Sequence, residues 1–283
     1  MFPYLDADVR HDSFPYTNVV LIGLCCLMFL YQLAVGGVGF LTGGGGVEVQ
    51  VLFLKWGFIP EELIRSQPYS TIVTEQGVTL SIETPLPTWV TIFSSMFMHG
   101  GFMHFAGNMM FLWVFGDNIE DRLGHVKYLF FYLFTGMVAT LAHFAIDSSS
   151  STPLVGASGA ISGVLGAYLV LYPYNRVKAL VVLYIITVIE LRAAILLGLW
   201  FVWQLFQGLI SLGLSSQVNV AFFAHIGGFV AGLLILVAIK LVAHEPLKPV
   251  NPGARTWIDA IGSGLLVPGG NRVVPVYPVL STA

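Results

Sequence analysis

Four polar residues lie in strongly apolar sequence, and their types are those of an acyl-transfer site. They are a serine, two histidines and an asparagine: Ser158, His225, His104 and Asn108. Serine is a weak nucleophile until a neighbouring base takes its proton, and histidine titrates in the range that suits this role. The developing oxyanion needs hydrogen-bond donors, which an asparagine amide and a second imidazole supply.

The composition places these residues in a membrane protein. The 283-residue chain is 56% hydrophobic and 10% charged, with a mean hydropathy of +0.83, whereas soluble domains carry about 25% charged residues. The net charge of −3 and the lack of a basic cluster argue against a nucleic-acid partner. Cys25 and Cys26 are adjacent in an apolar run and indicate neither a disulfide framework nor a metal site.

Six apolar segments are long enough to cross a bilayer core of about 30 Å as helices. The predicted spans are residues 19–35, 90–115, 126–146, 154–172, 192–212 and 218–242. With six spans, all Lys and Arg side chains except Lys55 and Arg65 fall on one side, which predicts that both termini are cytoplasmic. The β-branched run ALVVLYIITVI, at 179–189, predicts an extended or interfacial segment.

The spans divide the chain into three predicted parts. Residues 1–18 form a cytoplasmic N-terminal segment, residues 19–243 the membrane domain, and residues 244–283 a flexible, Pro- and Gly-containing cytoplasmic tail. The first span is expected to be a retained anchor. Residues 36–88 form a long external loop between helices 1 and 2, in which VLFLKWGFIPEELI predicts an amphipathic interfacial helix. The predicted fold class is an all-α polytopic membrane protein with a six-helix bundle.

The helix rise predicts that the serine and one histidine lie at the same depth. Ser158 is about 21 Å from Tyr172 along its helix, and His225 is about 22 Å from Lys240. Both spans run from outside to inside, so both distances are measured from the cytoplasmic face. The two side chains therefore fall about 8–10 Å below the external boundary of the core.

Glycines in the same two spans favour a close approach of the helices. One span carries Gly159 and Gly163, and the last span carries Gly228 and Gly232, each pair at i,i+4 spacing. Small residues at this spacing let helix backbones come close in lipid. The spacing therefore predicts that the serine hydroxyl lies within hydrogen-bond reach of the histidine in the last span.

The oxyanion donors are expected from the second span and from a helix terminus. His104 falls at the same depth, and Asn108 shares its helix face at i,i+4. The backbone N–H of Ser158 lies near a helix N-terminus, where amides are free. No Asp or Glu occurs between residues 191 and 244, and Asp147 is the nearest candidate for a third acid. A Ser–His dyad is the simpler hypothesis.

Each of these residues also has a purely structural interpretation. GASGAISG, at 156–163, is ordinary packing sequence for membrane helices. His104 and Asn108 are suited to hydrogen bonds between helices, and His99 to bracing the entrance of the loop. These interpretations do not predict a serine and a histidine at matching depth on two parallel helices.

Four motifs occur in a fixed order along the chain. They are HGGFMHFAGN (99–108), FGDNIEDRLG (115–124), GASG (156–159) and AHIGGFVAG (224–232). Together they resemble the rhomboid family of intramembrane serine proteases over residues 90–242. The resemblance implies a Ser158–His225 dyad, oxyanion roles for His104, Asn108 and the Ser158 N–H, and a water-filled cavity open to the external side, with a loop cap and a lateral gate near the fifth span.

The resemblance also implies an activity. It is a serine endopeptidase that cleaves single-pass or polytopic membrane-protein substrates near the outer face of the plasma (inner) membrane, through an acyl-enzyme and without a metal or cofactor. The sequence departs from the family pattern at two places. Trp89 is not followed by an arginine, and Ser162 occupies a position often held by an aromatic residue. We expect Ser162 to hydrogen-bond the His225 imidazole, or the imidazole to be less firmly held.

Two further interpretations belong to other classes of protein. A non-catalytic rhomboid-like protein would bind or escort membrane clients, but such proteins usually lack the serine or the histidine. A small-solute transporter would use the polar residues to line a pathway, but no inverted pair of broken helices is present in the sequence.

Overall fold

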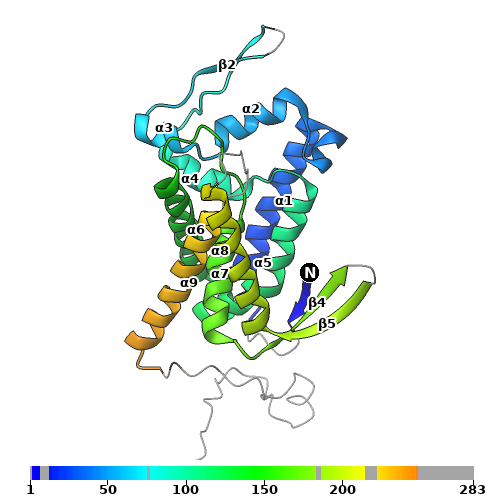
Figure 1. The fold of residues 1–283 in the computed structure, drawn as a ribbon, viewed down its shortest axis with the longest axis vertical. Coiled ribbons are helices and arrows are strands. Elements are labelled where there is room, and N and C mark those ends of the chain that lie inside the picture. The colour runs from blue at the N-terminus through cyan, green and yellow to red at the C-terminus, as the bar shows by residue number, and fades with distance from the viewer. Residues whose placement is uncertain are drawn as a thin grey trace, which may run out of the picture. The chain divides into compact units, whose positions relative to one another are not determined.

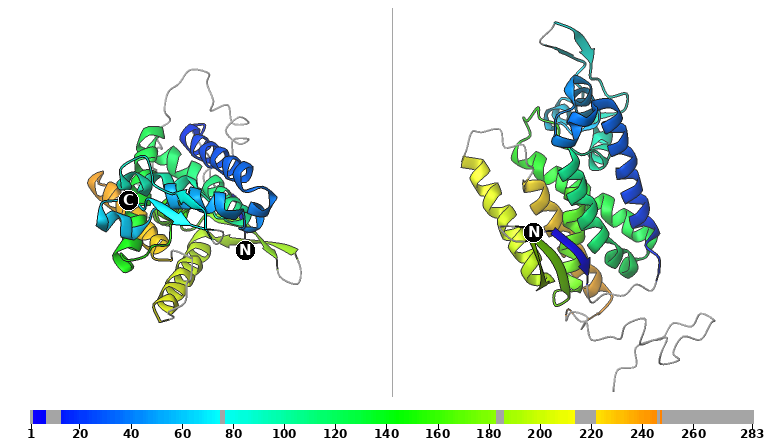
Figure 2. Two further views of the ribbon diagram at one scale, coloured as in Figure 1. Left: turned by 90° about the horizontal axis from the view of Figure 1, so that it is seen from above. Right: turned by 90° about the vertical axis from the view of Figure 1, so that its right-hand side faces the viewer.

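The computed structural model describes residues 2–6, 13–74, 77–182, 186–213, 222–245 and 247. The predicted C-terminal tail therefore lies almost wholly outside the described residues. Within the described residues, four helices are long and apolar enough to cross a membrane. They are α1 (Tyr16–Gly36), α6 (His125–Ile146), α8 (Ala193–Gly213) and α9 (Phe222–Val242). In Figure 2, α1 and α8 lie on opposite flanks of the bundle.

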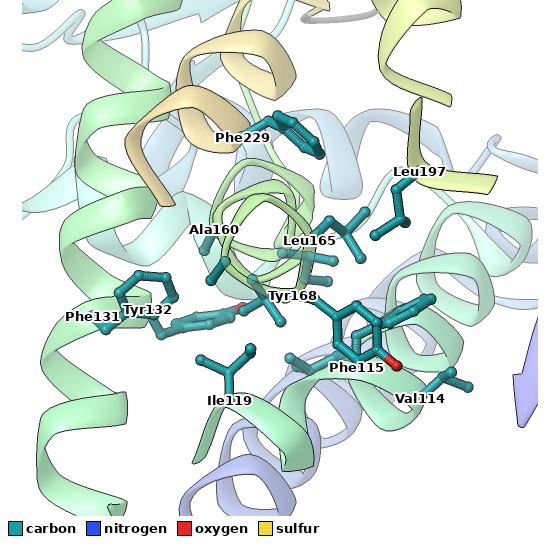
Figure 3. Packing of buried hydrophobic residues seen from close by; sticks show 14 of the residues in the cluster. Val114, Phe115, Ile119, Phe131, Tyr132, Ala160, Leu165, Tyr168, Leu197 and Phe229 are labelled. Carbon is teal, nitrogen blue, oxygen red and sulfur yellow. The ribbon is translucent and has the colours of Figure 1, made fainter. Parts of the chain in front are cut away.

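A shorter helix, α7 (Ser158–Leu171), occupies the centre of the bundle. Residues 160–168 are all buried, which is typical of a helix that is apolar on every side. Figure 3 shows α7 end-on, with side chains of the surrounding helices directed toward it. Leu165 and Tyr168 of α7 belong to one hydrophobic cluster with Tyr132 of α6 and Phe229 of α9. Residues of α5 (Phe102–Leu123) close the same cluster.

Helices α7 and α9 cross in backbone contact through glycines. A Cβ atom on Gly228 would lie 2.1 Å from the carbonyl oxygen of Gly159, and one on Gly232 would lie 1.9 Å from that of Gly163. Both distances are far below van der Waals contact, so only glycine fits at these two positions of α9. This close approach is the one that the glycine spacing predicts.

The predicted second span, residues 90–115, has the wrong boundaries. The structure has a short α4 (Thr91–Ser94) and η3 (Ser95–Phe97), then a non-helical stretch, and α5 begins only at Phe102 and continues to Leu123. Gly101 lies before α5 with a φ of +146°, where a Cβ atom would approach the Gly43 nitrogen to 3.1 Å. The helix is interrupted because the chain must pass close to another backbone segment there.

The last turn of α5 holds a buried carboxylate that organises the start of α1. Glu120 has no exposed surface and accepts hydrogen bonds from the backbone N–H groups of Thr17 and Asn18, at 2.8 and 2.7 Å. These are first-turn amides that have no partner within α1, and a negative charge at a helix N-terminus is favourable. His125 contacts the same carboxylate at 2.5 Å.

The segment between α1 and α5 contains several short elements at one end of the bundle (Figure 1). In chain order they are η1 (Val38–Thr42), α2 (Gly46–Trp56), α3 (Pro60–Arg65), β2 (Thr71–Val73), β3 (Thr79–Ser81) and η2 (Thr88–Val90). The predicted interfacial helix is divided in two at Gly57. There, Phe58 forms an isolated bridge with Leu154, the residue four positions before Ser158.

Helix α3, outside the membrane-spanning helices, contains a carboxyl group whose pKa is changed by burial. Glu62 is 2% exposed and accepts the N–H of Tyr69 at 2.8 Å, and burial raises its pKa above the ordinary value of 4.5. Because its folded-state pKa is raised, Glu62 adds to the free energy of unfolding below pH 4.5, and this contribution is lost as the pH rises through the folded-state pKa.

The effect of this burial can be tested by substitution. We expect Glu62→Gln, which is neutral but keeps an acceptor, to raise the melting temperature in detergent at pH 7. The gain should vanish at pH 4, and an equal effect at both pH values would contradict this account.

The expectation of an all-α fold is wrong at the end of the bundle opposite β2 and β3. The strands β1 (Phe2–Asp6), β4 (Arg176–Val182) and β5 (Ile186–Arg192) form an antiparallel sheet in the order β1-β4-β5 (Figure 1). Within the β-branched run predicted as extended or interfacial, the described residues 179–182 and 186–189 are extended and lie in β4 and β5. The predicted N-terminal segment contributes β1, which pairs with β4.

Candidate active site

Ser158 is the first residue of α7, at the end of an extended approach. The Gly156 N–H donates to the carbonyl of Ser95 at 2.9 Å, and Gly156 adopts a φ of +132°, which favours glycine. Ala157 then enters the helical region as the N-cap residue, without a side-chain cap. The N–H of Ser158 is one of the first-turn amides that have no partner within the helix.

His225, in the first turn of α9, meets this serine. Its Nε2 lies 2.7 Å from the Ser158 Oγ, although the two residues are 67 positions apart. The contact forms where the glycines bring α7 and α9 together, since Gly228 lies one turn after His225 on α9. A serine hydroxyl within hydrogen-bond reach of an imidazole is the arrangement that activates the hydroxyl for nucleophilic attack.

The other nitrogen of this imidazole contacts a residue that the sequence analysis did not identify. The Oε1 of Gln204, in α8, lies 2.8 Å from the Nδ1 of His225. A signal was present, because Gln204 is a polar residue within an apolar span and polar residues at membrane depth suggest function. Asp147, the nearest acid expected as a third group, is exposed at the end of α6.

Of the two alternatives given for Ser162, the hydrogen bond to the His225 imidazole is wrong. Its hydroxyl donates to the carbonyl oxygen of Ser158 at 2.6 Å and not to the imidazole. The hydroxyl of a serine within a helix commonly donates to the backbone carbonyl four residues earlier. The imidazole is held instead from α8, where the ring of Trp200 lies 6.0 Å from that of His225, centroid to centroid. Aromatic contact with His225 is therefore supplied by a different helix from the one that carries the serine.

His104 and Asn108 lie in the first two turns of α5, on the same side of the site. The N–H of Gly100 donates to the Nδ1 of His104 at 3.2 Å, so the proton of the neutral ring is on Nε2. A Cβ atom on Gly156 would lie 2.8 Å from this Nε2 and 3.5 Å from the Ser158 Oγ. Asn108 donates one amide hydrogen to the carbonyl of His104 at 2.9 Å, and its second N–H remains available.

All four predicted site residues line a single cavity of about 1250 Å³. Its wall also includes His143 and Asp147 on α6. His99 is fully buried and lies outside the cavity wall, and its backbone N–H donates to the side chain of Gln32 at 3.1 Å. This contact is made by the backbone of His99, and the bracing role expected of its side chain stays a prediction. Across the described residues, no group of three or more His, Cys, Asp or Glu side chains is placed to hold a metal ion.

Comparison with known proteins identifies the family. The family described as Rhomboid domain matches residues 87–241, more than half of the chain. The chain belongs to the rhomboid family. The match contains the helices α5 to α8 and nearly all of α9, and therefore Ser158, His225 and Gln204. Rhomboid membership and the four apolar helices together indicate an integral membrane protein.

Several curated proteins are similar to this rhomboid. RHOMBOID-like protein 5 of Arabidopsis thaliana is 30% identical over 168 residues, which are 57% of this chain and 47% of the relative. Rhomboid protease GluP of Bacillus subtilis is 31% identical over 154 residues, 54% of this chain and 26% of the relative. Rhomboid protein 1, mitochondrial, of Saccharomyces cerevisiae is 34% identical over 96 residues, 31% and 27%. The chain thus matches less than half the length of each of these relatives.

Proposed function

We propose that this rhomboid is an intramembrane serine endopeptidase that cleaves membrane-protein substrates. The observation that carries the proposal is the 2.7 Å contact between the Ser158 Oγ and the His225 Nε2. The contact lies in a cavity within an apolar bundle, where a polar pair is costly and points to function. The relative GluP of Bacillus subtilis is named a rhomboid protease, which supports the same assignment.

The proposed reaction is acyl transfer followed by hydrolysis. The Nε2 of His225 takes the hydroxyl proton as the Ser158 Oγ attacks the carbonyl carbon of the scissile peptide bond. The oxyanion that develops is stabilised by the Ser158 N–H, the Asn108 amide and the His104 Nε2–H. The protonated His225 then gives its proton to the leaving amine, and the acyl-enzyme forms. Water activated by the same imidazole releases the acyl group. The proposal requires neither a metal nor a cofactor, since these side chains move every proton.

We further propose the six-span arrangement for this chain, with α5 and α7 as the second and fourth spans. Helix α5 is 22 residues long, and α7 is shorter but buried at the centre of the bundle. In this arrangement the protein lies in the plasma (inner) membrane and both termini are in the cytoplasm. The proposed dyad therefore lies toward the outer face of the membrane. The substrates are single-pass or polytopic membrane proteins with small residues at the cleavage point.

The proposal is tested by purifying the chain, reconstituting it in proteoliposomes and adding transmembrane substrates with small residues near one end. We expect cleavage products, mapped by mass spectrometry, in the substrate segment near the outer face. The alternative is a non-catalytic rhomboid-like protein that binds clients. It predicts that substrates co-purify equally with the wild type and with Ser158→Ala and stay intact. Equal cleavage by these two proteins would indicate a contaminating protease and contradict the proposal.

Asn108 provides a test of the oxyanion assignment. We expect Asn108→Ala to lower kcat by about 10²- to 10³-fold while KM stays unchanged, because the second amide N–H, the one not bonded to the His104 carbonyl, donates to the charge that develops in the transition state. The measurement is initial rates over a range of substrate concentrations in proteoliposomes. An effect confined to KM would show that Asn108 binds substrate or only braces α5 through the carbonyl of His104.

A further inference from the structure

We propose that Gln204 is a positioning residue that holds His225 in the tautomer able to act as a base. The inference deepens the proposed function and rests on it. It starts from a contact that joins three helices, because the His225 imidazole of α9 bonds Ser158 of α7 through one nitrogen and Gln204 of α8 through the other. Gln204 is 8% exposed, so water competes little for its amide.

The two nitrogens of a neutral imidazole have opposite roles, and only one assignment is productive. The Nε2 faces the serine hydroxyl and must carry the lone pair, so the proton must reside on Nδ1. The Oε1 of Gln204 is solely an acceptor, and at 2.8 Å it receives the Nδ1–H. If the amide NH₂ group faced the ring instead, the proton would move to Nε2, and Ser158 would have no base.

An uncharged acceptor suits this position better than a carboxylate. An ionised carboxylate at membrane depth is costly unless it is paired. The sequence between residues 191 and 244 contains no Asp or Glu. The amide oxygen of Gln204 accepts the hydrogen bond without carrying a charge. Its partial negative charge also stabilises the positive charge that His225 acquires when it takes the serine proton.

Helix α8 restrains the imidazole at a second point. Trp200 precedes Gln204 by one turn of α8, and its ring lies 6.0 Å from that of His225. The amide therefore sets the direction of the Nδ1–H while the indole limits tilting of the ring. Both side chains come from the same face of one helix, since residues four apart are neighbours on a helix surface.

The test compares three variants of the full chain in proteoliposomes. We expect Gln204→Leu, which has no acceptor, to lower kcat by about 10- to 100-fold with KM unchanged, a range taken from hydrogen-bond partners that orient metal-binding histidines. Gln204→Glu keeps a carbonyl acceptor even when protonated and should recover most of the rate. Gln207→Leu is the matched control on the same helix, for which we expect wild-type kinetics.

Three results would overturn the inference. They are a kcat within twofold of the wild type for Gln204→Leu, a loss that appears in KM, and a loss that Gln204→Glu does not recover. Since wild-type cleavage is measured in the same assay, failure of the inference is distinguished from failure of the proposed function.

A spectroscopic measurement does not depend on a variant of Gln204. We expect ¹⁵N spectra of histidine-labelled wild type, with the His225 signals assigned by comparison with His225→Ala, to show a protonated Nδ1 and an unprotonated Nε2. A protonated Nε2 in the neutral ring would overturn the inference whether or not the protein cleaves substrate, because the Nδ1–H tautomer would then be absent.

Discussion

Ser158→Ala and His225→Ala should each lower kcat/KM for a transmembrane substrate by about 10⁴-fold or more, and the double variant should be no slower than either single one. The reason is that in the proposed mechanism the hydroxyl and the imidazole, 2.7 Å apart, act as one unit, so removing either leaves the other without a role in the chemistry. The measurement is a double-mutant cycle of cleavage rates in proteoliposomes.

Ser162→Ala is the control for this cycle. The two serines are one turn apart in α7, but the Ser162 hydroxyl bonds a backbone carbonyl and not the imidazole. We expect this variant to cleave substrate at a rate within about tenfold of the wild type, since losing one neutral hydrogen bond has a modest effect. If the losses of kcat/KM for Ser158→Ala and His225→Ala, expressed as free energies, were additive, the two side chains would act independently. The assignment of a Ser158–His225 dyad would then be wrong.

The second large effect is expected from the crossing of α7 and α9. The smallest possible side chain at residue 232 would place a Cβ atom 1.9 Å from the carbonyl oxygen of Gly163, a backbone atom that cannot move alone. Gly232→Ala should therefore push the two helices apart and lower the free energy of unfolding by about 1–3 kcal/mol or more. It should also slow cleavage, because the same two helices hold Ser158 and His225 in contact.

Gly198→Ala, in α8, is the matched control for this substitution. Apart from its chain neighbours and the backbone of α8 itself, no atom of the described residues lies within 4 Å of a Cβ built at Gly198. Because alanine is the better helix former, Gly198→Ala should leave the melting temperature equal to that of the wild type or slightly higher. Comparing the two variants by thermal unfolding in detergent separates the effect of crossing geometry from that of any glycine replacement. A Gly232→Ala protein as stable as the wild type would contradict the close packing.

The contact between Ser158 and His225 could be predicted from the sequence because it depends on regular helix geometry. The rise of an α-helix converts residue spacing into depth, and this placed Ser158 and His225 at the same level. The i,i+4 glycines then indicated which helices approach closely. Both arguments are local to one helix at a time, so they hold without knowledge of the rest of the fold.

The features that the sequence did not predict depend on contacts between distant segments. The interruption before Phe102 follows from the close passage of Gly101 and Gly43, which apolar periodicity does not reveal. The partner of the His225 Nδ1 was sought among acids, although an amide satisfies the same geometry. The pairing of β1 with β4 joins residues more than 170 positions apart, and propensity predicts strands but not their partners.

The most direct test of the central claim is labelling with a serine-directed fluorophosphonate. The active, detergent-solubilised protein is treated with the reagent, digested and mapped by mass spectrometry. The account predicts one covalent adduct, on Ser158, that is lost in His225→Ala and kept in Ser162→Ala. The absence of an adduct on Ser158 in protein that cleaves substrate, or equal labelling of the His225→Ala protein, would contradict the account.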